Sequence, residues 1–228
     1  MIELHNVTKK FSTTNQALLD ITLKINQGEF VFVVGPTGSG KTTLLRLLTR
    51  EILPTNGKVL IDSEDLAKLK GKKVTQLRRQ IGVIFQDFKL LFDQTVFENV
   101  ALPLEILGLS NKEITHRVNN ILEMVGLSKQ KNLFPGQLSG GEVQRTTIAR
   151  AIINDPKIIL GDEPTGNLDP ATSWEIMKLL KDIHKKRGIP LIIATHNMDI
   201  VNAMGKRVVR IESGKIISDK EGGKYEKN

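Results

Sequence analysis

The feature that most constrains this chain is a glycine-rich turn between an apolar run and a leucine-rich segment. Residues 30–34 are all Phe or Val, and residues 44–48 include four leucines. A buried strand, such a turn and a helix, in this order, form the context in which the pattern G-x-x-x-x-G-K-S/T binds phosphate. The sequence therefore predicts a nucleoside triphosphate site. The turn reads Gly35-Pro36-Thr37-Gly38-Ser39-Gly40-Lys41-Thr42-Thr43.

The residue types of this turn have physical reasons. Glycine tolerates positive φ and carries no side chain, so glycines at 35, 38 and 40 let successive N–H groups converge on phosphates. A helix beginning near Lys41 adds the positive end of its dipole. We expect Lys41 to reach the β and γ phosphates and the Thr42 hydroxyl to bind Mg²⁺.

In the segment 157–164, a second apolar run, residues 158–160, follows Lys157 and leads into Gly161, Asp162, Glu163 and Pro164. Adjacent residues of an extended strand point to opposite faces, so the two acids can have different tasks. Asp162 suits the Mg²⁺ side and Glu163 suits polarising the attacking water. Taken alone, Asp-Glu-Pro is also typical of an ordinary turn after a strand. Its combination with the phosphate turn favours the catalytic interpretation.

A third apolar run, residues 190–195, ends at His196. Histidine can donate a hydrogen bond to a γ-phosphate and help hold the water. A single histidine after a strand is more often structural. Three strand ends that carry polar groups are nevertheless expected where open α/β sheets bind ligands.

A second helix cap suited to an anion lies between these strands. It reads Leu138-Ser139-Gly140-Gly141-Glu142 and precedes a helical pattern over 143–153. One chain therefore has two phosphate-binding ends but a single Lys41 loop. Two copies arranged head to tail, each cap closing over the triphosphate of its partner, use all of these parts with two-fold symmetry.

With these motifs the chain resembles the ATP-binding cassette (ABC) ATPases over nearly its whole length. The family's phosphate loop matches 35–43, its signature matches 138–142, its acidic strand matches 158–163 and its switch histidine matches His196. Its glutamine matches Gln86, and its aspartate loop matches 166–169. The resemblance implies that Gln86 contacts the metal or water, and that Asp169 links the two halves of a dimer. Phe11 stands where the family has an adenine-stacking aromatic, and stacking there would accept ATP or GTP.

The resemblance and the periodicity together predict an α/β fold. We expect a P-loop NTPase (RecA-like) core with a mainly parallel sheet, a flanking antiparallel β layer and an inserted α-helical subdomain. Strand patterns near 2–7, 18–25, 58–63 and 208–217 suggest the antiparallel layer. Residues 1–87 and 155–218 would form the core, residues 88–154 a helical lobe and residues 219–228 a frayed polar tail.

Composition indicates the compartment. The 228 residues contain no cysteine, so no disulfide framework is expected. The N-terminus has neither the basic region nor the apolar core of a secretory signal, and no apolar stretch approaches the roughly 20 residues that span a bilayer. These features predict a soluble, cytosolic polypeptide.

A cluster of cations lies between residues 68 and 79, in a chain whose net charge is +8. It is typical of a solvated loop, or of a surface for nucleic acid or an anionic membrane. Residues 64–81 contain no aromatic side chain for stacking on bases, which favours the membrane over nucleic acid. The cluster consists of Lys68, Lys70, Lys72, Lys73, Arg78 and Arg79.

Finer resemblance concerns residues 85–100 and 162–177, which are similar to the bacterial cell-division ATPases of the FtsE group. The second stretch contains Trp174, which could equally pack its own helix or contact a partner. This similarity implies an FtsX-like integral membrane subunit as partner, a peripheral location on the cytoplasmic face of the membrane, and ATP-driven dimer closure that signals to cell-wall hydrolases. The alternatives are an ATPase of a lipoprotein-releasing or macrolide-type exporter and, more remotely, a soluble nucleic-acid-associated ABC ATPase.

The same similarity places membrane docking in the groove between the Gln86 loop and the helical lobe. Exposed apolar clusters commonly mark interfaces. Packing inside the helical lobe is the competing interpretation for these side chains. The four candidate anchors are Phe88, Leu90, Leu91 and Phe92.

Overall fold

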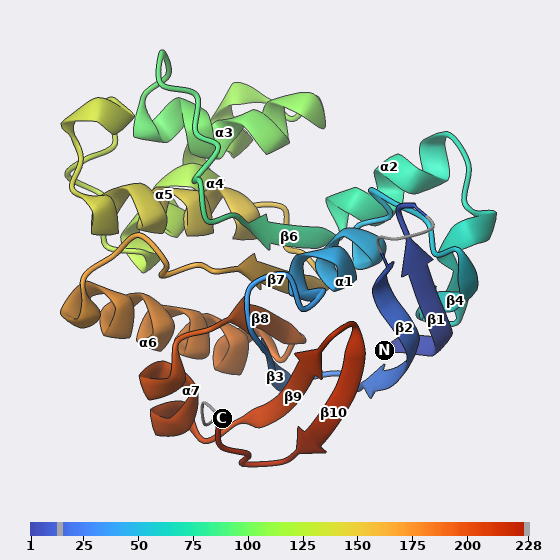
Figure 1. Ribbon diagram of the computed structural model, residues 1–228. Helices are drawn as coiled ribbons and strands as arrows, with labels where there is room; N and C mark the ends of the chain where they lie inside the picture. Colours follow the sequence, from blue (N-terminus) through green and yellow to red (C-terminus); the bar gives the residue numbers. More distant parts are fainter. Residues whose placement is uncertain (13–15, 226–228) are drawn as a thin grey trace.

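A six-stranded sheet forms the centre of the computed structural model, which describes residues 1–12 and 16–225 (Figure 1). The strand order is β10-β9-β3-β8-β7-β6. Neighbouring strands from β9 to β6 pair in parallel, and β10 pairs antiparallel with β9 at the edge. The bounds are β3 Phe30–Val34, β6 Ile81–Ile84, β7 Ile158–Asp162, β8 Leu191–Thr195, β9 Arg207–Glu212 and β10 Lys215–Lys220.

A second, antiparallel sheet has the order β2-β1-β4-β5. It confirms the predicted antiparallel layer for the N-terminal strands but not for 208–217. That segment is two strands, β9 and β10, and both belong to the central sheet, because β9 pairs with β3. The bounds of the second sheet are β1 Ile2–Lys10, β2 Gln16–Ile25, β4 Asn56–Ile61 and β5 Glu64–Asp65.

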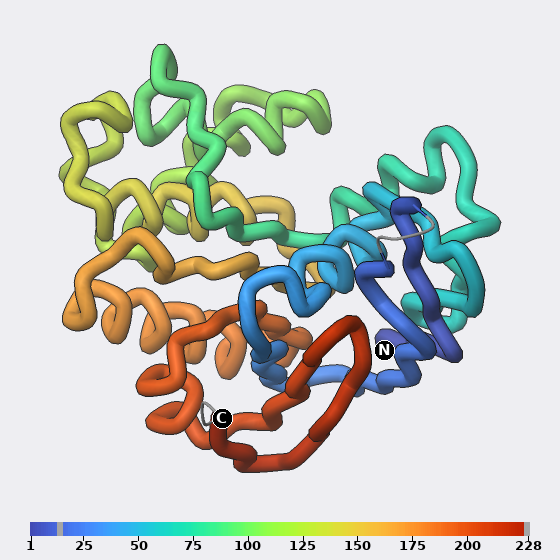
Figure 2. Tube along the Cα trace, viewed as in Figure 1, coloured from blue at the N-terminus to red at the C-terminus, as the bar shows by residue number. Residues whose placement is uncertain are grey.

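Helices cover both faces of the central sheet, and three of them follow one another between β6 and β7. Figures 1 and 2 show these three, α3 to α5, at the opposite end of the molecule from α2 and the N-terminal strands. The helices are α1 Lys41–Leu48, α2 Lys72–Arg79, α3 Val96–Ile106, α4 Asn111–Met124, α5 Gly140–Ile152, α6 Pro170–Arg187 and α7 Met198–Met204, with 3₁₀ turns at Leu66–Lys68 and Pro135–Gln137.

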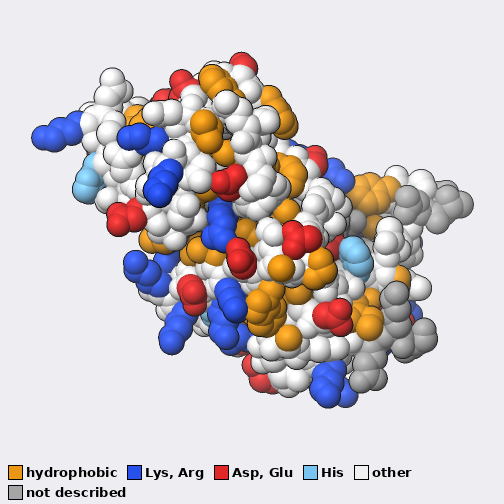
Figure 3. Space-filling view, turned by 90° about the vertical axis from the view of Figure 1, so that its left-hand side faces the viewer, with side chains coloured by type: hydrophobic (Ala, Val, Ile, Leu, Met, Phe, Trp, Pro, Cys, Tyr) orange, Lys and Arg blue, Asp and Glu red, His pale blue; other side chains and the backbone are white. Residues whose placement is uncertain are grey.

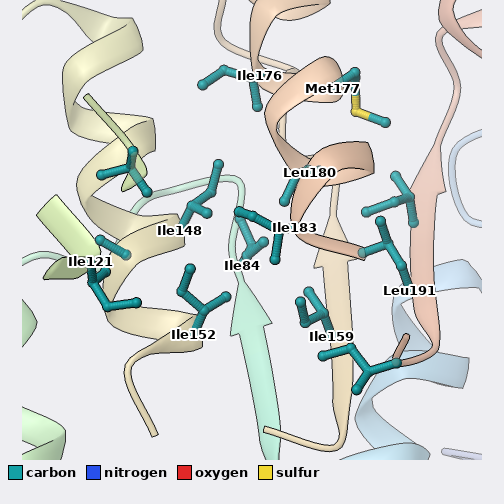
Figure 4. Close-up of a cluster of buried hydrophobic side chains, with 14 of the residues drawn as sticks. Ile84, Ile121, Ile148, Ile152, Ile159, Ile176, Met177, Leu180, Ile183 and Leu191 are labelled. Atoms are coloured by element: carbon teal, nitrogen blue, oxygen red, sulfur yellow. The ribbon is translucent and has the colours of Figure 1, made fainter. Parts of the chain in front are cut away.

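Two hydrophobic cores lie on the two sides of the central sheet. Alternate residues of one strand enter different cores: Phe32 belongs to the core under α3–α7, whereas Val31 and Val33 pack against α1 and the second sheet. Strands buried on both faces read as continuous apolar runs, which is why the sequence shows no alternation there. Figure 4 shows the first core, where Ile148 and Ile152 of α5 meet Ile84 of β6.

The structure differs from the predicted frayed tail over 219–228 at three of the residues that it describes. Residues 219 and 220 are the last two of β10. Tyr225 is buried, and its backbone N–H donates to Asn202 Oδ1 at 2.7 Å while Asn202 Nδ2 donates to the Tyr225 carbonyl at 3.0 Å. Residues 226–228 lie outside the described residues. Among the described residues, none of the helices has the length and apolar character needed to span a bilayer.

Candidate functional site

The phosphate loop connects β3 to α1, as the sequence predicts. Its glycines at 35, 38 and 40 have φ values of 149°, 78° and 112°. A Cβ at Gly35 would lie 2.0 Å from the carbonyl oxygen of Ile211, so glycine is required there for space as well as conformation. Lys41 donates to the carbonyl oxygens of Gly35 at 2.8 Å and Pro36 at 3.1 Å, which holds its ammonium group across the loop.

The loop retains two groups that suit an anion. The Ser39 hydroxyl is buried and has no hydrogen-bond partner among the described residues. Burial lowers the pKa of Lys41, while the charges of Glu163 and Asp162 oppose this effect. An unpartnered hydroxyl and a partly desolvated ammonium are groups that a bound phosphate would satisfy.

Asp162 and Thr42 lie together at the end of β7, with Thr42 Oγ1 donating to Asp162 Oδ1 at 3.2 Å. Burial raises the pKa of Asp162, and the hydrogen bond from Thr42 works against that rise. One carboxylate and one hydroxyl are hard oxygen donors that fit Mg²⁺, since this ion needs few protein ligands when phosphates and water complete its shell. The pair is thus suited to a magnesium ion carried by a triphosphate.

Glu163 and His196 form a direct pair that the sequence does not reveal. His196 Nδ1 lies 2.7 Å from Glu163 Oε1, and the His196 backbone N–H donates to Oε2 at 3.4 Å. Glu163 has a φ of 48°, which is uncommon for a residue with a side chain. The carboxylate is therefore held from two sides on a backbone that turns sharply, beside the Asp162 and Thr42 pair.

The Gln86 loop borders these groups. Gln86 is exposed, and its carbonyl accepts a hydrogen bond from Asn167 Nδ2 at 3.0 Å. A groove of about 1140 Å³ runs from Thr42 and Asp162 past Gln86 to the ends of α2, α3 and α5. Lining residues at its far end include Arg78, Arg79, Leu102, Pro103 and Arg150.

The signature residues Leu138–Glu142 open α5 as a cap. Ser139 is its N-cap: its hydroxyl donates to Glu142 Oε2 at 2.8 Å and accepts from the Glu142 N–H at 3.4 Å. The Ser139 backbone N–H, which donates to Glu142 Oε2 at 2.8 Å, and after it the Ser139 hydroxyl lower the pKa of Glu142. Ser139, Gly140 and Gly141 line a separate hollow with Asp169, which itself caps α6 by accepting from the Thr172 N–H at 3.0 Å. Among the residues that the structure describes, Asn167 alone lines both this hollow and the groove.

Phe11 is half exposed near the end of β1, with Lys9 Nζ 5.2 Å from its ring centre. Its ring is open to a stacking partner. Residues 13–15, immediately beyond, lie outside the described residues.

The structure also identifies two side chains for which sequence analysis predicts no role. Arg150 of α5 donates to the carbonyl oxygens of Lys89 at 2.6 Å and Phe88 at 2.8 Å, two consecutive residues with positive φ. Asn99 of α3 donates to the Leu91 carbonyl and accepts from the Leu91 N–H, each at 2.9 Å. The Arg150 contacts span 61–62 positions, so no local sequence pattern could predict them. The Asn99 contacts with Leu91 span eight positions.

Comparison with known proteins agrees with this geometry. The family model described as ABC transporter matches residues 18–166 of the chain. The chain belongs to the ABC transporter ATPase family. It therefore binds and hydrolyses ATP.

Three curated relatives of this family member are cell division ATP-binding proteins named FtsE. Those of Bacillus subtilis, Mycobacterium tuberculosis and Streptococcus pneumoniae D39 are 51%, 48% and 45% identical to it, and each alignment covers 99% of this chain and 97–98% of the relative. Among solved structures, the ATP-binding cassette MJ0796 in a dimeric post-hydrolysis state with ADP and Pi is 37% identical, with a TM-score of 0.88 over 99% of this chain and 100% of that chain.

Proposed function

We propose that this ABC ATPase is the nucleotide-binding subunit of an FtsE-like cell-division complex, paired with an FtsX-like integral membrane subunit at the cytoplasmic face of the membrane. The observation that carries the proposal is identity of 45–51% over 99% of the chain to three proteins of that name. Methionine import ATPases are also similar, at 44% identity for the Pectobacterium atrosepticum protein, but this chain covers only 64% of that relative.

In the proposed mechanism, Lys41 and the N–H groups of residues 35–43 bind the triphosphate and Phe11 stacks on the base. Thr42, Asp162 and Gln86 would hold Mg²⁺, which would neutralise phosphate charge. Glu163, oriented by His196 at 2.7 Å, accepts the proton of the attacking water. His196 also has a second ring nitrogen that can face the γ-phosphate.

The proposal includes a head-to-tail dimer. Ser139, Gly140 and Gly141 lie in a hollow apart from Thr42 and Asp162, so the cap of one copy would close over the triphosphate of its partner. Leu138 and Glu142 would support that cap, and Asp169, in the same hollow, would connect the two halves. The dimeric MJ0796 cassette, 38% identical to this chain, supports this arrangement.

Docking on the membrane subunit would use the groove beside the Gln86 loop. Of the four anchors expected from sequence, Leu91 and Phe92 are 42% and 69% exposed, whereas Leu90 is only 6% exposed and packs inside, and Phe88 is half-buried. For Leu90 the competing interpretation, packing inside the protein, is the one that fits its burial. Ile106 and Leu107 at the end of α3 are also exposed apolar residues.

The test is the variant Leu91→Asp, co-expressed with the candidate membrane subunit. A charge at this exposed position should abolish recruitment to membranes and leave ATP binding of the purified chain intact. The matched control is Ile217→Asp, a 50% exposed residue of β10, which should be recruited normally. Normal recruitment of the Leu91 variant would remove the docking assignment.

A further inference from the structure

The cations between residues 68 and 79 form one exposed surface over α2 and the turn before it, here called the basic surface. All six side chains are exposed, and residues 66–80 contain no Asp or Glu. The segment thus contributes +6 of the chain's net charge of +8. The members are Lys68, Lys70, Lys72, Lys73, Arg78 and Arg79.

The backbone beneath the basic surface is fixed in place. Leu66, Leu69 and Leu77 are buried in the core shared with the second sheet. Arg50 donates to the carbonyl oxygens of Leu66 at 2.9 Å and Leu69 at 3.2 Å. Because these buried leucines and hydrogen bonds already order the backbone, binding through the cations would not carry the entropic cost of ordering it.

The six cations make few contacts within the molecule, of which Arg78 makes two by donating to the carbonyl oxygens of Thr49 at 3.2 Å and Arg50 at 3.1 Å. Within the described part of the chain, the one ion pair made by this surface joins Lys73 to Glu64 at 3.9 Å, between two exposed side chains. Lys72 and Lys73 occupy the first turn of α2, where the helix dipole is positive, and no acidic residue is present there. Cations at this end of a helix are electrostatically unfavourable, so helix stability does not explain them.

The position of the basic surface indicates its partner. Arg78 and Arg79 line the same groove as Gln86, Asp87 and Lys89. The basic surface is therefore continuous with the groove assigned above to membrane docking. By contrast, the opposite side of the molecule shows interspersed basic and acidic side chains (Figure 3).

We propose that the basic surface binds the anionic headgroups of the membrane beside the docking groove. The inference deepens the proposed function, since the groove orients this surface towards the bilayer. Each Lys or Arg near an anionic leaflet contributes about 1 kcal/mol, so several together bind appreciably. Nucleic acid is the less suitable partner because residues 64–81 carry no aromatic side chain for base stacking.

The experiment is flotation of the purified full chain with vesicles of phosphatidylcholine alone or with about a third phosphatidylglycerol. The wild-type chain should bind only the anionic vesicles and dissociate as salt rises towards about 0.5 M, where screening is strong. The variant Lys68→Gln, Lys70→Gln, Lys72→Gln, Lys73→Gln should lose about 100-fold or more in partition, consistent with four such contributions.

The matched control replaces four exposed lysines of α6 by glutamine, with the same change in net charge. These are Lys178, Lys181, Lys185 and Lys186. The control variant should partition within about threefold of wild type. Equal losses in both variants, or no binding of the wild-type chain to anionic vesicles, would overturn the proposal.

Two further experiments distinguish lipid headgroups from other anionic ligands. Displacement of the chain from vesicles by inorganic phosphate at about 20 mM would reveal a simple anion site, and tighter binding of duplex DNA than of vesicles would reveal a nucleic-acid surface. Either result overturns the lipid assignment. Leu91→Asp should still bind anionic vesicles, so failure of the docking groove and failure of the basic surface give different results.

Discussion

At the scale of single residues, Glu163 is the group that the proposed mechanism uses as its base. Its carboxylate contacts His196 through both oxygens, at 2.7 Å and 3.4 Å, and its side chain is only 13% exposed. A general base is effective when its proton acceptor is fixed near the water it activates. The pair therefore fits a base and its orienting partner.

Replacing Glu163 with Gln should slow ATP hydrolysis by about two to four orders of magnitude, the usual contribution of a positioned base. ATP binding should persist because Lys41 and the loop are intact, and an ATP-bound dimer should accumulate. Single-turnover hydrolysis and light scattering measure the two effects. Lys41→Ala provides the contrast, since it should weaken triphosphate binding itself. Near-normal turnover of the Glu163 variant would place the base elsewhere.

Ser139 has two roles that substitutions can separate. Ser139→Ala removes the hydroxyl half of the capping box and leaves the hydrogen bond from the residue 139 backbone N–H to Glu142 Oε2, so it should cost about 1 kcal/mol of the free energy of unfolding. Ser139→Asn keeps a good N-cap, so it should restore stability. If the serine closes over the partner's triphosphate, the Asn variant should still hydrolyse ATP poorly. Thermal unfolding and steady-state ATPase measure the two properties, and full activity of the Asn variant would leave only the cap.

At the scale of elements, α5 holds both ends of the proposed machinery. Its N-cap is the signature serine, and Arg150 in its last turn fixes the backbone of Phe88 and Lys89. Burial lowers the pKa of Arg150, and its partners are carbonyl oxygens. A shift of this helix would therefore move the turn that carries Leu91 and Phe92.

Arg150→Met should loosen that turn, because two carbonyl oxygens lose their guanidinium donor at a cost of about 1–3 kcal/mol each if left buried. Hydrogen exchange of the amides of residues 88–92 should accelerate. The control is Arg145→Met on the same helix, whose side chain pairs with Glu175 at 3.0 Å instead. Unchanged exchange in the Arg150 variant would show that the remaining contacts, from Asn99 and from Thr147 to the Phe88 carbonyl at 3.4 Å, hold the turn.

Elements also show where sequence reasoning succeeds. The phosphate loop could be predicted because its chemistry depends on contiguous residues, and α1 begins at Lys41 as expected. The strand pattern over 208–217 was detected but assigned to the wrong sheet, since alternation does not say which neighbour a strand pairs with. The polar composition of the tail did not allow the burial of Tyr225 to be predicted. The Tyr225 backbone forms two hydrogen bonds with the Asn202 side chain. The Arg150 contacts likewise exist only in the folded chain.

At the scale of the whole molecule, Arg207 connects the two sheets. It donates to Asp219 at 2.7 and 2.8 Å, to Glu29 at 2.7 Å and to the carbonyl oxygen of Lys24, in β2, at 2.9 Å. Burial acts to raise the pKa of Glu29, but hydrogen bonds from Asn26 and the charge of Arg207 outweigh it and lower the pKa. A carboxyl whose pKa is lowered on folding stabilises the protein above its unfolded pKa, and this stabilisation is lost as pH falls through the folded value.

Arg207→Met should lower the free energy of unfolding at pH 7 by about 2 kcal/mol, because it removes charge-assisted hydrogen bonds. The variant should also lose less additional stability than wild type as pH falls below about 4.5, the ordinary range of a glutamate pKa. Urea unfolding at several pH values tests this. Arg117→Met, which removes an exposed pair with Glu113 on α4, serves as control and should change little. Parallel pH profiles for wild type and the Arg207 variant would contradict the assignment.

The separation of the Ser139 hollow from the groove at Thr42 has a kinetic consequence. When neither half is complete alone, turnover in dilute solution rises with the square of protein concentration, by mass action. Confining the molecules to a thin layer multiplies encounters without any new contact. The hydrolysis rate would then depend on the local concentration of the protein, and molecules at low concentration elsewhere would hydrolyse little ATP.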